Sequence, residues 1–328
     1  MRSWRGFTAV CATVGAVVLG AATPAAAATS TTFGPVAITG VPAAELKIHK
    51  VQALGRIEAQ LTAGQTAYVY STLRAYGSAD VNLVDNEVRC SGAGASNVVM
   101  GENIDPAANA NPGRGDITII NRFLVSATST GTLSCTLSVR TSSLTNNTSS
   151  FTVSGTLRFA SLNVAEDTNG LAMQTSLPNG NTVVGSTPVY TPVLDRTIAP
   201  GHTQVAVIAD VEYMSCYPTT CEHSSTTSDA RFTLFARQLN GASECAQAPM
   251  AQTSVSVSKQ THHKAVPLYT TLTLAPGCDR IYAYVRAEYV GGPTGAIQGQ
   301  SAGLTDETGG AGGERHDSAM THLFAVPS

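Results

Sequence analysis

Short segments of alternating apolar and polar residues recur along most of the chain. In residues 205–213 (VAVIADVEY) every second residue, from Val205 to Tyr213, is apolar or aromatic. This period of two is typical of a β-strand whose two faces meet different surroundings. Further segments that we predict to be strands are residues 68–76, 81–89, 117–127, 132–141, 151–160, 231–238, 251–258, 268–274 and 280–289. The pattern predicts a protein built mainly of short strands.

Residues 45–61 also fit a helix, because their apolar side chains could lie along one helical face. The corresponding stretch later in the chain contains Pro188 and Pro192, and a helix interior does not accept proline. We therefore predict a strand in both stretches.

Two segments of the chain resemble each other. Residues 60–76 (QLTAGQTAYVYSTLRAY) and 196–213 (RTIAPGHTQVAVIADVEY) both place a glycine turn before a strand that ends on tyrosine. The alignment that matches Gly64 with Gly201 also matches Tyr76 with Tyr213. Near the end of the chain, THLFA resembles the earlier TLRFA. We interpret these matches as an internal duplication.

About seven short strands in each half favour two tandem β-sandwiches of jelly-roll or immunoglobulin-like type. The turn-rich residues 166–185 form the predicted boundary, so that residues 29–185 are the first sandwich and residues 186–328 the second. Two Gly-rich stretches, residues 92–116 and 291–313, are predicted to be long surface loops.

The duplication leaves one conflict between the two central strands. In the alignment that matches Gly64 with Gly201, Val69 and Leu73 fall on the face opposite to that of Val205. Either the alignment shifts by one position, or the first strand is covered on both faces.

Residues 1–28 have the pattern of a cleaved secretory signal peptide. Arg2 and Arg5 precede an apolar stretch over residues 7–21, and alanines at 25–28 provide a small-residue cleavage site. The apolar stretch is shorter than the roughly 18 residues of a membrane-spanning helix. Leader and composition are typical of exported bacterial proteins, so we predict a secreted, extracellular protein.

Removal of the leader changes the formal net charge from −3 to −5, because Arg2 and Arg5 are lost, and it also removes the single tryptophan. A mildly acidic chain has no electrostatic basis for binding nucleic acid or an anionic membrane. We therefore expect no nucleic-acid partner and no membrane span.

Six cysteines remain after the leader, and an even number in an exported chain predicts disulfide bonds. Matching places in the two halves favour one bridge in each half, and the remaining two cysteines would close a small loop. The predicted bridges are Cys90–Cys135, Cys245–Cys278 and Cys216–Cys221. The stretch CYPTTCEH at residues 216–223 also has the spacing of a metal site, which is less favoured because thiols oxidise outside the cell.

The sequence contains neither the G-x-S-x-G motif of serine hydrolases nor the H-E-x-x-H motif of zinc proteases. His262 and His263 lie in a polar stretch and are predicted to belong to a surface loop. A structural Ca²⁺ ion is left open, since residues 102–116 and 166–170 offer oxygen ligands, although neither stretch has EF-hand spacing. We predict no other cofactor. The tripeptide Arg114-Gly115-Asp116 matches integrin ligands, and we attribute it to chance.

Asp210 and Glu212 are the best carboxylate pair that the sequence offers to a glycoside hydrolase, because both lie on one face of the strand at residues 205–213. In the alignment of the two halves their counterparts are Leu73 and Ala75, so the first half does not repeat the pair. A solvent-facing strand edge explains the two acids more simply.

Tyrosines are the candidate sugar-stacking residues in a mature chain without tryptophan. Tyr282 and Tyr284 alternate with Ile281, Ala283 and Val285, so both faces of that strand carry large side chains. This pattern favours packing roles for most tyrosines. The other candidates are Tyr68, Tyr70, Tyr76, Tyr213 and Tyr289.

The sequence therefore favours a secreted, non-catalytic protein with a binding or structural role, whose partner is a polysaccharide, a cell-surface component or another protein. One alternative is a secreted hydrolase that uses Asp210 and Glu212. Another is an inhibitor or toxin-associated subunit that presents its Gly-rich loops to a protein. An exposed row of tyrosines would favour sugar binding, an apolar patch a protein partner, and acids in a shared cleft the hydrolase.

Overall fold

The computed structural model describes residues 30–42, 49–77, 81–103, 116–143, 151–162, 173–176, 180–197, 201–218, 223, 226–259, 261–305 and 315–327. The regular elements in this part of the chain are β-strands, and none of it forms a helix long and apolar enough to cross a membrane. The all-β prediction is confirmed. The predicted signal peptide lies outside the described residues.

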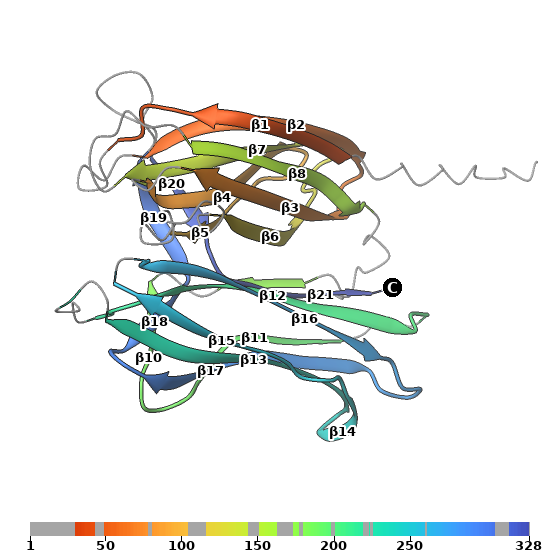
Figure 1. Cartoon of the computed structure of the whole chain (residues 1–328). Coiled ribbons are helices and arrows are strands. Elements are labelled where there is room, and N and C mark those ends of the chain that lie inside the picture. The colour runs from red at the N-terminus through yellow and green to blue at the C-terminus, as the bar shows by residue number, and fades with distance from the viewer. Residues whose placement is uncertain are drawn as a thin grey trace, which may run out of the picture.

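The first half is a sandwich of two antiparallel sheets (Figure 1). One sheet has the order β1 (Ser30–Ile38), β8 (Phe151–Ser161), β3 (Thr66–Gly77) and β6 (Ile117–Ser126). The other has the order β5 (Ser96–Glu102), β4 (Val81–Gly92), β7 (Gly131–Ser143) and β2 (Lys50–Leu61). The stretch at residues 45–61 that also fitted a helix is a strand where it is described.

The second half repeats this order. One sheet contains β9 (Met173–Ser176), β21 (His322–Pro327), β12 (Gln204–Met214) and β16 (His263–Thr273), with β18 (Gly295–Gln298) and β10 (Asn181–Val184) added beside β12. The other contains β11 (Val189–Thr197), β17 (Arg280–Gly291), β13 (Thr227–Asn240) and β15 (Ala251–Ser258), and β14 (Ser243–Gln247) also pairs with β13. Eight strands that alternate between two sheets in this order make a jelly roll, not an immunoglobulin-like sandwich.

The sheets cross the predicted boundary at residue 185 in three places. β9 and β10 both precede the boundary, yet β9 pairs with β21 and β10 with β18 of the second half. The hairpin of β19 (Gln300–Thr305) and β20 (Arg315–Ala319) follows the boundary, yet it extends the first half's sheet, where Ala319 pairs in parallel with Val98 of β5. The division into residues 29–185 and 186–328 stays a prediction, but the two sequence halves exchange strands.

Both Gly-rich stretches were predicted to be loops, and this prediction is wrong for their described parts. Residues 92–116 contain the whole of β5, and residues 291–313 contain β18 and β19. The small residues of β5 led to this error, because Gly101 and its neighbours are packed inside the molecule and do not face solvent.

The structure resolves the conflict between the central strands β3 and β12. Ala67, Val69 and Leu73 face the core of the first half, as Val205, Val207 and Val211 face that of the second. The inward faces therefore match when the alignment shifts by one position, which is the first of the two explanations that the sequence left open. With this shift Asp210 and Glu212 correspond to Thr72 and Arg74. Duplication itself stays a prediction.

Two of the predicted disulfides are present. Cys90 and Cys135 are directly opposite each other on β4 and β7, and both belong to the buried core of the first half. Cys245 of β14 is bonded to Cys278 in the turn before β17, at the surface. Cys216 is also disulfide-bonded, and its predicted partner Cys221 lies outside the described residues.

Removing the surface bridge by Cys245→Ser with Cys278→Ser should lower the free energy of unfolding by about 3–4 kcal/mol, because the unfolded chain regains a loop of 33 residues. Removing the buried bridge by Cys90→Ala with Cys135→Ala should cost more, since a larger loop opens and two core side chains lose volume. Urea unfolding of both variants measures the difference. Equal stability of wild type and the buried-bridge variant would contradict this ranking.

Candidate functional site

The predicted acids Asp210 and Glu212 lie between the two halves. β12 has its inner face in the second core, and its outer face meets β6 and β5 of the first half. At one end of this interface Ile208, Leu124 and Phe324 form a small apolar cluster, and the Tyr68 ring lies edge-on to Phe324 at 5.4 Å. Asp210 and Glu212 follow on the same face of β12.

Asp210 forms an ion pair with Arg122 of β6. The Arg122 Nη2 donates to Asp210 Oδ1 at 2.6 Å, and its Nε lies 3.1 Å from both carboxylate oxygens. The same Nη2 donates to the carbonyl oxygen of Leu268 at 3.1 Å. Asp210 is 1% exposed, and this burial raises its pKa while Arg122 opposes the rise. The interpretation of a solvent-facing edge is wrong, because the first half covers this face of β12.

Glu212 lies beside a second acid, Asp85 of β4. It accepts a hydrogen bond from the Gly101 N–H at 2.8 Å, and its Oε1 lies 2.9 Å from His263 Nδ1. A Cβ added to Gly101 would be 2.5 Å from Asp85 Oδ1 and 3.2 Å from Glu212 Oε1, so both carboxyl groups border this glycine. Glycine is required here because a side chain would displace them.

Burial sets the protonation of this group. It raises the pKa of Glu212 to about 8 and lowers the pKa of His263 to about 4. Burial therefore disfavours the charged form of both groups. His263 begins β16 and is mostly buried, so its prediction as a surface-loop residue is wrong.

The carboxyl groups at the interface serve to join the halves. A hydrolase requires acids that contact its substrate, whereas Asp210 and Glu212 are 1% and 2% exposed and engaged with Arg122, Gly101 and His263. Further polar contacts cross the same interface. They are the ion pair of Lys264 with Glu102 and the hydrogen bonds between the backbone of His263 and Asn103.

A different surface combines exposed aromatic rings with polar groups, on the outer face of β11, β17, β13 and β14. The alternation along β17 places Ile281, Ala283 and Val285 in the core and Tyr282 and Tyr284 outside. The predicted cross-strand packing of these tyrosines is confirmed by their ring contacts, but this tyrosine face of β17 is only half-buried.

Tyr284 is the centre of the aromatic cluster. It stacks on Phe235 of β13 at 5.0 Å between ring centroids, and it contacts Tyr190 of β11 at 5.6 Å and Tyr282 at 5.8 Å. Tyr190 is 54% exposed, and the Arg237 guanidinium lies over the Tyr282 ring at 4.9 Å. We call these residues the aromatic face; it consists of Tyr190, Phe235, Arg237, Tyr282 and Tyr284.

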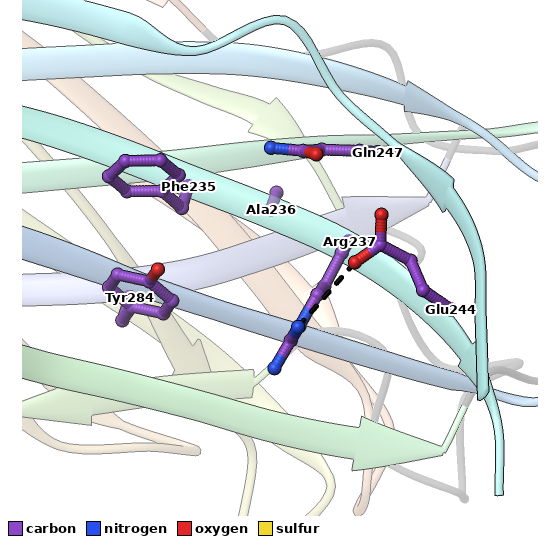
Figure 2. A pocket seen from close by; sticks show the side chains of 6 residues that line it. All are labelled: Phe235, Ala236, Arg237, Glu244, Gln247 and Tyr284. Atoms are coloured by element: carbon purple, nitrogen blue, oxygen red, sulfur yellow. Dashed lines mark hydrogen bonds and ion pairs between the residues drawn. The ribbon is translucent and has the colours of Figure 1, made fainter. Parts of the chain in front are cut away.

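A shallow pocket of about 170 Å³ opens on the aromatic face (Figure 2). Figure 2 shows Phe235 and Tyr284 at one end and the Arg237–Glu244 pair at the other, with Gln247 above Ala236. The pocket is smaller than the roughly 300–1,000 Å³ of sites that enclose a drug-sized ligand. It therefore fits one ring or side chain of a longer ligand that lies across the sheet.

The aromatic face can bind a molecule that has both apolar and hydroxyl surfaces. Ring faces accept the C–H side of such a ligand, while Arg237, Glu244 and Gln247 provide donors and acceptors at the pocket rim. Tyr282 and Tyr284 were candidates from the sequence, whereas Tyr190, Phe235 and the polar rim were not. These residues come from four strands, β11, β13, β14 and β17, and only the pairing of these strands brings them together. No pattern within a short stretch of sequence predicts which strands pair.

Other predicted features fall partly outside the described residues. Asp116 of the Arg-Gly-Asp tripeptide forms an ion pair with Arg74, and Arg114 and Gly115 are not described. Most of the two stretches suggested for Ca²⁺ is likewise not described. Within the described ranges, no group of three or more His, Cys, Asp or Glu side chains is placed to hold a metal ion.

Comparison with known proteins and solved structures gives only distant matches. No family model and no curated protein match the sequence. A structure titled for the triple jelly roll fold and turret assembly of an archaeal virus shares 10% identity over 82% of this chain, with a TM-score of 0.21, and this chain covers 59% of its length. The CBM22-1-CBM22-2 tandem of Paenibacillus barcinonensis Xyn10C shares 10% identity over 84% of this chain and 97% of that one, with a TM-score of 0.23. The STIV MCP shares 10% identity over 74% of this chain and 97% of that one, at 0.20. Likeness at this level carries no functional argument.

Breaking the interface ion pair from one side should strongly destabilise the protein. Asp210→Ala leaves the buried Arg122 charge without its carboxylate, and we expect a loss of about 3–5 kcal/mol in the free energy of unfolding. The control is Arg122→Met with Asp210→Leu, which removes both charges and should cost much less. Denaturant unfolding of both variants tests this, and an equal loss in the two would refute the role of pairing.

Glu212 should make the protein less stable as the pH rises from about 6.5 to 8. The native carboxyl group keeps its proton up to a pKa of about 8, whereas the unfolded one has lost it, so the unfolded state binds fewer protons in this range. Glu212→Gln keeps the neutral form and should flatten this part of the stability curve. The test is to measure the free energy of unfolding of wild type and Glu212→Gln across this pH range. Parallel curves for the two proteins would contradict the raised pKa of Glu212.

Proposed function

We propose that this protein is an exported, non-catalytic polysaccharide-binding protein, which holds its ligand on the aromatic face of the second half. The observation that carries the proposal is the cluster of Tyr284 with Phe235, Tyr190 and Tyr282 beside a pocket with a charged rim. Rings that are partly exposed on a rigid sheet bind sugar faces without losing much side-chain freedom.

The arrangement of polar groups favours a sugar as the ligand and not the apolar surface of another protein. Arg237 lies over the Tyr282 ring and is also paired with Glu244. An aromatic ring, a cation and a carboxylate are therefore adjacent on this surface. Sugars present hydroxyl groups at the edge of each apolar face, and such groups match a rim of donors and acceptors. The disulfides support an oxidising, extracellular setting.

The experiment is a binding assay of the mature chain on insoluble and soluble polysaccharides. Tyr190→Ala with Tyr284→Ala should weaken binding at least about tenfold, since two ring contacts are lost. The control is Tyr269→Ala, because Tyr269 of β16 is 54% exposed like Tyr190 but lies on the opposite sheet. The control variant should bind like wild type.

Three outcomes would count against the proposal. If both variants bind a polysaccharide as tightly as wild type does, the ligand lies elsewhere. If wild type binds none of the polymers, the aromatic face has another kind of partner. Release of soluble sugar during the same assay would favour the hydrolase alternative.

A further inference from the structure

The first half has aromatic and arginine side chains on a different sheet, the outer face of β3 and β8. Along β3, Tyr70, Thr72, Arg74 and Tyr76 point away from the core, opposite to the buried Val69 and its neighbours. The β6 side of this sheet is covered by the second half, but these four β3 side chains stay half-buried or exposed.

Arginines lie over two of the tyrosine rings. Arg158 of β8 is opposite Tyr70 in the strand register, and its guanidinium carbon is 4.5 Å from the Tyr70 ring centre. Arg74 lies 5.8 Å from the centre of the Tyr76 ring and is paired with Asp116. Between them, the Thr72 and Thr156 hydroxyls are hydrogen-bonded at 2.9 Å. We call this set the arginine–tyrosine surface.

The charges of this surface differ from those of the aromatic face. Arg237, Arg280 and Arg286 of the second half all have carboxylate partners on neighbouring strands or residues. Arg158 is exposed, and among the described residues its close partner is the Tyr70 ring and no carboxylate. A guanidinium held flat on a ring keeps its edge N–H donors free for an anionic group.

The surface is also unlike a protein-docking patch. The large hydrophobic side chains that are well exposed in the described structure all belong to the second sandwich, which includes β10: Val183, Tyr190, Val193, Met250, Tyr269, Tyr289 and Val290. The arginine–tyrosine surface instead presents hydroxyl groups, tyrosine rings packed against arginines, and the Arg158 cation. This combination matches a sugar that carries a carboxylate.

We infer that the arginine–tyrosine surface is a second polysaccharide site, which takes carboxylate-bearing sugars, such as uronates, with Arg158 on the carboxylate and Tyr70 against the ring. The inference rests on the proposed polysaccharide-binding function.

The test measures binding of the full mature chain to polygalacturonate and to its carboxyl-reduced, neutral form. Arg158→Gln should weaken binding to the acidic polymer about tenfold and leave the neutral polymer unaffected, because one charge-assisted contact is lost. The affinity of wild type for the acidic polymer should fall with added salt more steeply than that of the variant. Arg56→Gln is the control, since Arg56 is an exposed arginine (side chain 62% exposed) on β2 of the other sheet.

The outcomes separate the two proposals. If Tyr190→Ala with Tyr284→Ala loses binding but Arg158→Gln matches Arg56→Gln, the second site is refuted and the proposed function stands. If Arg158→Gln loses acidic-polymer binding while the tyrosine variant does not, the second site stands and the aromatic face is refuted. Failure of wild type to bind either polymer overturns the second site.

Discussion

The ion pair between Arg122 and Asp210 constrains the rest of the molecule. An almost fully buried carboxylate is tolerated only when a cation and further hydrogen bonds compensate its lost hydration, and Arg122 provides both from the other half of the chain. The pair fixes which face of β12 meets the first half. The apolar contact of Ile208 with Leu124 lies on one side of this ion pair, and the hydrogen-bonded Glu212–His263 pair lies on the other.

This use of β12 determines what each sheet can do. In the second half β12 is buried on both faces, whereas Tyr284 and its neighbours lie half-buried or exposed on the opposite sheet. In the first half the corresponding sheet (β5, β4, β7 and β2) has a buried ion pair on its central strands. Glu87 of β4 and Arg140 of β7 lie on its outer face, and both are completely buried as an ion pair. The same fold therefore presents different surfaces in its two halves.

Sequence patterns predicted the features that depend on residues close together in the chain, such as strands. Period-two alternation predicted the strands, and the matching positions of cysteines predicted the bonds Cys90–Cys135 and Cys245–Cys278. Burial of Asp210 was missed because its partner is 88 residues away, and a charged residue on an alternating strand normally faces solvent. Tyr284 was assigned to packing because its strand is apolar on both faces, and only the sheet order shows that one face is uncovered.

The most direct test is amide hydrogen exchange of the mature protein with and without a bound polysaccharide. The account predicts added protection in β11, β13 and β17 around Tyr190, Phe235 and Tyr284, with an acidic polymer also protecting β3 and β8. Exchange in β12 and β16 at the interface should not change. Added protection confined to the strands around Asp210 and Glu212 would instead place the ligand between the halves and contradict the account.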